Sequence, residues 1–143
     1  MRISAHGIRA DLPAGWDGRI SRRPNGQAVL QAANFRLPLE DGDFATTATS
    51  TMPPDGVVVV LVEYEPALAG SGLFAPPGPP QVLTAADFNP ATMLRRIPGQ
   101  AGVQRFFSNG GRAFCLYAVI GSRADATALA ARATALLGTL NLA

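Results

Sequence analysis

The sequence predicts an α+β fold: one domain in which a mainly antiparallel β-sheet packs against a C-terminal α-helix. Three observations support this. Two runs, Val57 to Tyr64 (VVVVLVEY) and Ala113 to Ile120 (AFCLYAVI), are apolar on consecutive positions, as expected of strands covered on both faces. The turn-forming pairs Asn25-Gly26 and Gly110-Gly111 separate strand-like runs. Residues 124–137 carry apolar side chains at helical spacing.

The chain length is that of one domain, and we assign residues 1–143 to it. Size scaling for a 14.9 kDa chain gives a folded surface of roughly 7,000 Å² against roughly 21,600 Å² for the unfolded chain. About two-thirds of the surface would then be buried. Such a chain can build a core without disulfides or metals.

The first third of the chain predicts strands. Ile8 to Leu12 alternates apolar and charged residues, which is typical of a half-buried strand. After a turn at Pro13 to Gly15, Arg19 to Arg23 predicts an exposed strand. Asn25-Gly26 accepts the positive φ values of a type I′ turn, so Ala28 to Phe35 should return as a third strand.

The middle of the chain is less regular. Residues 40–51 are polar and Thr-rich, and the sequence leaves loop, edge strand and short helix all open. Val57 to Tyr64 should be the central strand. Residues 66–80 are rich in Pro and Gly and predict an extended surface loop. Leu73 and Phe74 either pin this loop to the domain or face a binding partner.

The last third predicts a hairpin followed by a helix. Gln104 to Phe107 and Arg112 to Ile120 form the two arms of the hairpin. Residues 124–137 form the helix, with its apolar stripe packed on the sheet. Residues 139–142 should form a short last strand.

Composition and charge exclude several classes of protein. All 12 basic residues are arginine, and the net charge of +2 is too small to indicate a nucleic-acid partner. The start of the chain does not resemble an export signal. The longest strongly apolar run, Val57 to Val62, is far shorter than the ~20 residues of a membrane helix. We therefore expect no membrane insertion and a cytoplasmic location.

Charge is divided into three zones along the chain. Residues 1–36 carry a net charge of +4, residues 37–94 contain only acidic charges and reach −7, and residues 95–143 carry +5. Separate patches of this kind could steer a polar partner. The favoured interpretation is that the zones are neighbours in the fold and pair across strands and loops.

The sequence lacks the residues that most kinds of catalytic site require. His6 is the only histidine and Cys115 the only cysteine, so a catalytic zinc site or a Cys/His cluster is excluded. No G-x-S-x-G motif is present to place a nucleophile. A thiol in an apolar strand such as that of Cys115 should be buried and inert. The loop Pro98 to Gly102 lacks the ending of a phosphate-binding P-loop. We predict no catalytic residue, no metal and no cofactor.

A carboxylate pair is the last enzymatic possibility. Glu63 and Glu65 lie two positions apart at the end of a strand, and carboxyl groups ~5–5.5 Å apart serve retaining glycosidases. The favoured alternative is that an arginine of a neighbouring strand pairs with them. The chain has one tryptophan, too few aromatic residues for a sugar cleft.

Two binding hypotheses remain. The first is a non-enzymatic adaptor or chaperone-like module that binds a protein partner through Leu73 and Phe74. The second is a protein that binds a small anionic ligand in a pocket between sheet and helix. A filled core with an exposed apolar patch would favour the first, and a pocket of ~300 Å³ or more with a convergent arginine the second.

The predicted ligand pocket uses five residues. Trp16, Phe106 and Tyr117 would line it, and Arg95 or Arg105 would hold the anionic group. Guanidinium suits this role because its planar fork matches carboxylate and phosphate. The alternatives are a core tryptophan and a solvated basic edge.

Two short motifs resemble a known fold group. Gly7 to Trp16 (GIRADLPAGW) and Ala135 to Leu142 (ALLGTLNL) resemble the PsbP-like group, which includes the photosystem extrinsic subunit and the DcrB proteins. The resemblance implies a fold in which helices flank an antiparallel sheet. It also implies a role as an adaptor, chaperone or assembly factor, without catalytic residues. Pro98 to Phe107 (PGQAGVQRFF) is similar to small uncharacterised proteins of high-GC bacteria, which imply no activity.

Overall fold

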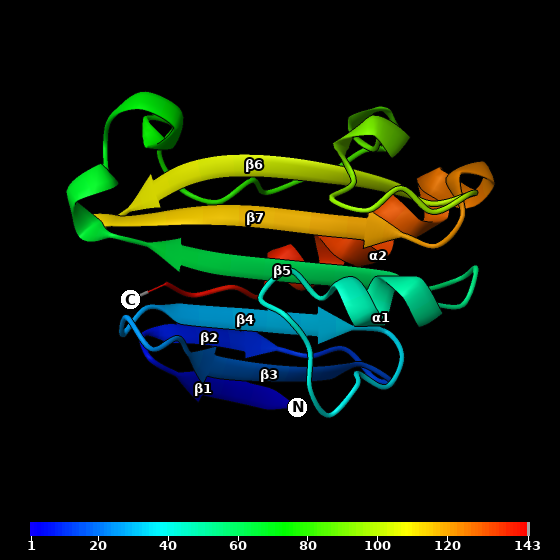
Figure 1. The fold of residues 1–143 in the computed structure, drawn as a ribbon, viewed down its shortest axis with the longest axis horizontal. Helices are drawn as coiled ribbons and strands as arrows, with labels where there is room; N and C mark the ends of the chain where they lie inside the picture. Colours follow the sequence, from blue (N-terminus) through cyan, green and yellow to red (C-terminus); the bar gives the residue numbers. More distant parts are fainter. Residues whose placement is uncertain (143) are drawn as a thin grey trace.

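Five antiparallel strands form the main sheet of the computed structural model, which describes residues 1–142 (Figure 1). In spatial order the strands are β3 (Asp17–Arg22), β4 (Ala28–Ala33), β5 (Val57–Tyr64), β7 (Arg112–Ile120) and β6 (Ala101–Asn109). A second sheet holds only β1 (Arg2–Ala5) and β2 (Ile8–Asp11). With the C-terminal helix α2 (Ala126–Leu137), these sheets form one small α+β domain, so the predicted fold class is confirmed.

The central position of β5 follows from its sequence. Six consecutive residues from Val57 to Val62 are fully buried, because alternate side chains enter two separate apolar clusters. Val59 lies in one cluster and Val60 in the other. A strand with no polar face is stable only between two covered faces. The chain as a whole exposes 6955 Å², in line with the roughly 7,000 Å² that its size predicts.

Helix α2 and the β1–β2 hairpin cover one face of the sheet, and α2 lies behind the strands in Figure 1. The helix contributes Leu129, Ala133 and Leu136 to the cluster on this face. The hairpin adds Ile8, and an isolated bridge joins Arg9 of β2 to Asn141. The predicted last strand over 139–142 is therefore reduced to this single bridge.

The opposite face is covered by the segment that the sequence left undecided. It forms a short helix, α1 (Thr46–Thr51), in front of the sheet in Figure 1. Ala45, Ala48 and Met52 are buried against the strands. Asp41 supplies the missing cap, because its carboxylate accepts hydrogen bonds from the backbone N–H groups of Thr47 and Ala48 at 3.0 and 2.8 Å.

The long connections contain four 3₁₀ turns. They are η1 (Pro66–Leu68), η2 (Gly72–Phe74), η3 (Ala85–Asp87) and η4 (Pro90–Thr92), and a fifth, η5 (Arg123–Asp125), leads into α2. Isolated bridges from Pro77 and Asn89 close both ends of edge strand β6. Such covering limits pairing of an edge strand with other chains.

The three charge zones are neighbours in the fold, as the favoured interpretation predicted. Three ion pairs join a basic zone to the acidic one: Arg23–Asp43, Arg105–Asp87 and Arg112–Glu63. Within residues 1–142, no helix combines the length and apolar character needed to cross a bilayer.

Candidate functional site

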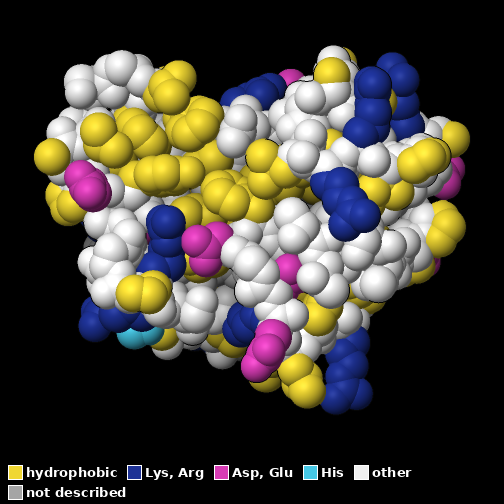
Figure 2. All heavy atoms as spheres, viewed as in Figure 1, with side chains coloured by type: hydrophobic (Ala, Val, Ile, Leu, Met, Phe, Trp, Pro, Cys, Tyr) yellow, Lys and Arg dark blue, Asp and Glu magenta, His cyan; other side chains and the backbone are white. Residues whose placement is uncertain are grey.

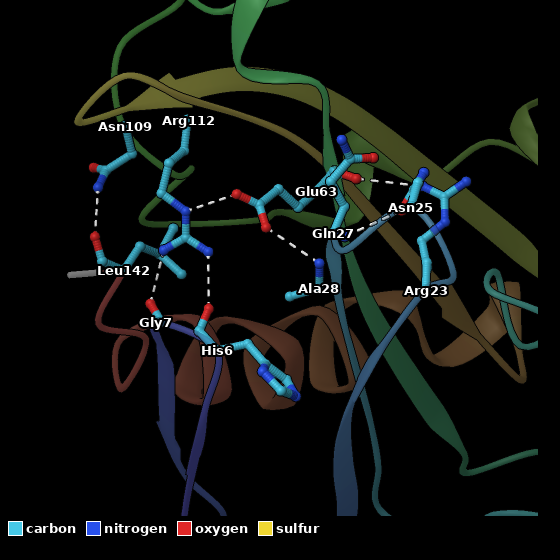
Figure 3. Close-up of polar contacts among 10 residues, drawn as sticks. All are labelled: His6, Gly7, Arg23, Asn25, Gln27, Ala28, Glu63, Asn109, Arg112 and Leu142. Atoms are coloured by element: carbon cyan, nitrogen blue, oxygen red, sulfur yellow. Dashed lines mark hydrogen bonds and ion pairs between the residues drawn. The ribbon is translucent and has the colours of Figure 1, made fainter.

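Glu63, one of the two candidate carboxylates, is the centre of a polar network (Figure 3). Arg112 Nε donates to Glu63 Oε2 at 2.8 Å, and the Ala28 backbone N–H donates to Glu63 Oε1 at 3.1 Å. The same guanidinium donates to the carbonyl oxygens of Gly7 and His6 at 2.9 and 3.1 Å. Arg112, paired with Glu63, therefore joins the main sheet to the β1–β2 turn.

This environment fixes Glu63 as a carboxylate. Burial raises its pKa, but the hydrogen bonds from Arg112 and Ala28 and the nearby positive charge outweigh burial and lower it below 4.5. Glu65 is exposed and forms no ion pair within residues 1–142. The favoured interpretation, pairing with an arginine of the neighbouring strand, is confirmed for Glu63.

His6 and Cys115 lie apart, in a turn and in the core. His6 lies in the turn between β1 and β2 at a φ of 51°. Only its carbonyl oxygen takes part in the network of Figure 3. Cys115 is fully buried in β7, and burial raises its pKa to about 11, despite a hydrogen bond from Gln104. The thiol is therefore protonated at neutral pH.

The structure does not assemble the predicted pocket between sheet and helix. Trp16 packs on the cluster that contains α2. Tyr117 belongs to the cluster on the other face, and its hydroxyl accepts a hydrogen bond from the Leu94 N–H at 3.1 Å. Phe106 points to that second face as well, because its neighbour Phe107 enters the α2-side cluster. A ligand between sheet and helix could not touch all three aromatic residues.

The two predicted anion-binding arginines also lie apart from that pocket. Arg105 is engaged by Asp87, with Nη2 3.0 Å from Oδ1. Arg95 is exposed and lies outside the two cavities described below. Arg96, the next residue along the chain, does line one of these cavities.

Residues 66–80 form the predicted surface loop, and Phe74 anchors it. Phe74 is only 6% exposed and packs edge-on against Phe106 with ring centroids 5.4 Å apart. It also contacts Tyr64 at 5.4 Å. The expectation that Phe74 is open to a partner is therefore wrong, whereas the alternative, that it pins the loop, is confirmed.

Leu73, next to this anchor, faces outward. It is 66% exposed, and Leu68 on the same loop is 42% exposed. Figure 2 shows hydrophobic side chains gathered over this end of the sheet, where η1 and η2 lie in Figure 1. We call Leu68, Leu73 and the half-buried rings of Tyr64 and Phe106 the loop surface.

Ser108 of β6 holds the backbone of the loop, a role that sequence reasoning missed. Its hydroxyl donates to the Phe74 carbonyl oxygen and accepts from the Gly70 N–H at 2.8 Å. Its backbone pairs with the loop through Pro76 O and Gly78 N at 2.9 and 2.7 Å. A lone serine at the end of a strand carries no sequence signal for such a role.

Two surface cavities lie elsewhere. One, of about 560 Å³, is lined by Pro90, Arg96, Ile97, Pro98, Gly99, Gln100 and Arg123. The other, of about 330 Å³, lies between segment 82–85 and the outer side of α2. Within residues 1–142, no group of three or more His, Cys, Asp or Glu side chains is arranged to hold a metal ion.

Comparison of the chain with protein-family models, curated proteins and solved structures gave no match. The resemblance of Gly7–Trp16 and Ala135–Leu142 to the PsbP-like group therefore stays a prediction. The loop surface and the larger cavity are the two features of the fold on which a function can be argued.

Proposed function

We propose that this chain is a non-enzymatic module that binds a protein partner through the loop surface. The observation that carries the proposal is the exposure of Leu73 and Leu68 beside two half-buried aromatic rings. Scattered apolar residues are normal on a protein surface, but a contiguous group is typical of an interaction site. We expect the interaction in the cytoplasm.

The loop surface is preorganised for binding. Phe74 fixes the loop from below, and Ser108 fixes its backbone. A surface already held in one conformation loses less conformational entropy when a partner docks. This loop carries exposed leucines and is held in one conformation. Both properties suit a binding surface better than a loop that only connects two strands.

The chemistry of the loop defines the partner. Residues 66–80 contain no charged side chain, so contact there depends on apolar burial rather than on ion pairing. We therefore expect a partner that presents apolar side chains. Its affinity should change little with salt concentration, because screening acts on charges.

The test is site-specific photo-crosslinking in the native host. A benzoylphenylalanine residue replaces Leu73, and a matched chain carries it at Leu39, which is 91% exposed and lies outside the loop surface. Amine-reactive cross-linkers are a poor choice, since the chain has no lysine. The expected result is one dominant crosslinked protein from position 73 and none from position 39.

In a second experiment, Leu68→Asp is added to the chain that carries benzoylphenylalanine at position 73. It adds a charge at the edge of the loop surface without touching the Phe74 anchor, and it should abolish the crosslink. The same crosslinked protein from positions 73 and 39, or a product made only of this chain, would overturn the proposal.

A further inference from the structure

The larger cavity lies at the end of the domain opposite the loop surface. The connection into β6 meets the connection from β7 to α2 there, at the right-hand end of Figure 1. The Arg123 backbone N–H donates to the Gly99 carbonyl oxygen at 2.7 Å, so the two connections are fixed to one another. The cavity between them measures about 560 Å³, within the usual size range of small-molecule sites.

The wall of this cavity is positively charged. Arg96 and Arg123 both line it, and no carboxylate does. Within residues 1–142, neither guanidinium forms an ion pair or a side-chain hydrogen bond, unlike those of Arg105 and Arg112. Two unpaired guanidinium groups in one cavity match the charge of a dianion, and their planar forks match phosphate oxygens.

Gln100 gives this cavity a fixed inner wall. This wall residue is only 5% exposed. Its Nε2 donates to the Thr49 carbonyl oxygen at 2.8 Å, which fixes the orientation of the amide. Its Oε1 is buried and has no hydrogen-bond partner within the described chain. This oxygen is shielded inside the fold rather than open to the cavity, so recognition of a ligand falls to the two arginines.

We propose that this cavity binds a small phosphomonoester. Arg96 and Arg123 hold the phosphate. A water molecule occupies about 30 Å³ of liquid. A phosphate ion is only a few times larger, so the cavity has room for an organic group attached to the phosphate. The site shares no residue with the loop surface, so either proposal can fail without the other.

The test is a titration followed by NMR, at constant ionic strength, on the amide of Gly99 and the arginine Nε–H groups. The probes are glucose 6-phosphate, glucuronate and glucose. All three have a hydroxylated ring. Glucose 6-phosphate is a dianion, glucuronate is a monoanion and glucose is uncharged. We expect glucose 6-phosphate to bind most tightly, glucuronate more weakly and glucose most weakly. The binding of glucose 6-phosphate should be saturable, with a Kd below about 10 mM.

Three variants test the assignment to residues. Arg96→Gln and Arg123→Gln should each weaken glucose 6-phosphate binding at least tenfold. Arg36→Gln is the matched control, since Arg36 is an exposed arginine outside the cavity, and it should stay within twofold of wild type. All three substitutions lie on exposed residues, so amide spectra should confirm an unchanged fold.

Several results would overturn the proposal. One is no saturable binding of glucose 6-phosphate at about 10 mM. Another is binding of glucuronate or glucose as tight as that of the phosphate ester. A third is an equal loss of affinity in all three arginine variants, which would show that net charge alone attracts the probe.

Discussion

Arg112 and Glu63 form the ion pair that joins the end of the main sheet to the N-terminal hairpin. Their atoms Nε and Oε2 lie 2.8 Å apart, and both side chains are mostly shielded from solvent. The arginine also donates to the carbonyl oxygens of His6 and Gly7. One guanidinium therefore satisfies acceptors from two sheets (Figure 3).

Arg112→Met should destabilise the protein strongly. The substitution leaves the Glu63 carboxylate shielded from solvent without its cation, and loss of one partner of a buried pair costs about 3 kcal/mol. Urea denaturation monitored by circular dichroism measures the free energy of unfolding. Arg2→Met is the control, because the Arg2–Asp11 pair is exposed, and it should cause a much smaller change. Equal losses in the two variants would contradict the structural role of Arg112.

Glu63 also predicts a pH dependence of stability. Its pKa is lowered in the folded protein, so folding favours its charged form. The stabilisation is fully present above the ordinary glutamate pKa of 4.5, which the unfolded chain keeps. It is lost as pH falls through the folded pKa, because the unfolded chain binds the proton first. In urea denaturation from pH 6 to 3, Glu63→Gln should lose less stability than wild type. Parallel curves for the two proteins would contradict this prediction.

Phe74 and Leu73 should respond in opposite ways to truncation. Phe74→Ala removes a buried ring that packs on Tyr64 and Phe106, and substitutions of this kind cost about 3 kcal/mol. Leu73→Ala removes an exposed side chain and should change stability by less than about 0.5 kcal/mol. Thermal unfolding of both variants measures the difference. A stable Phe74→Ala protein would show that the loop is not anchored through this ring.

The strands of the core could be predicted from sequence because their signal is local. β5 and β7 carry apolar residues on both faces, and only a covered central strand suits such a run. Helix α1 could not be predicted in the same way. Its sequence is rich in Thr, and its cap comes from Asp41, several residues before the helix. Tertiary contacts therefore decide its conformation.

The predicted ligand pocket failed for a related reason. In a strand that is apolar on both faces, the sequence does not show which side chains face the helix. In β7, Leu116 faces α2 and Tyr117 faces away. A shift of one residue in register would exchange them. Arg96 and Arg123 are far apart in the sequence, and they line one cavity because two loops meet where the Arg123 N–H donates to the Gly99 carbonyl oxygen.

Cys115 should be unreactive in the folded protein. The thiol is 0% exposed and burial raises its pKa to about 11, so both access and the thiolate fraction are low at pH 8. We expect negligible reaction with Ellman's reagent at pH 8 under native conditions, and one equivalent after unfolding in urea. The native rate should then report opening of the layer that covers the Cys115 face of β7, since the sulfur lies beside Gln104 and Tyr64 on that face. Arg112→Met should raise this rate by weakening the end of the sheet where β7 begins, while Leu73→Ala should leave it unchanged. Rapid modification of the native wild-type protein would contradict both the burial and the raised pKa of Cys115.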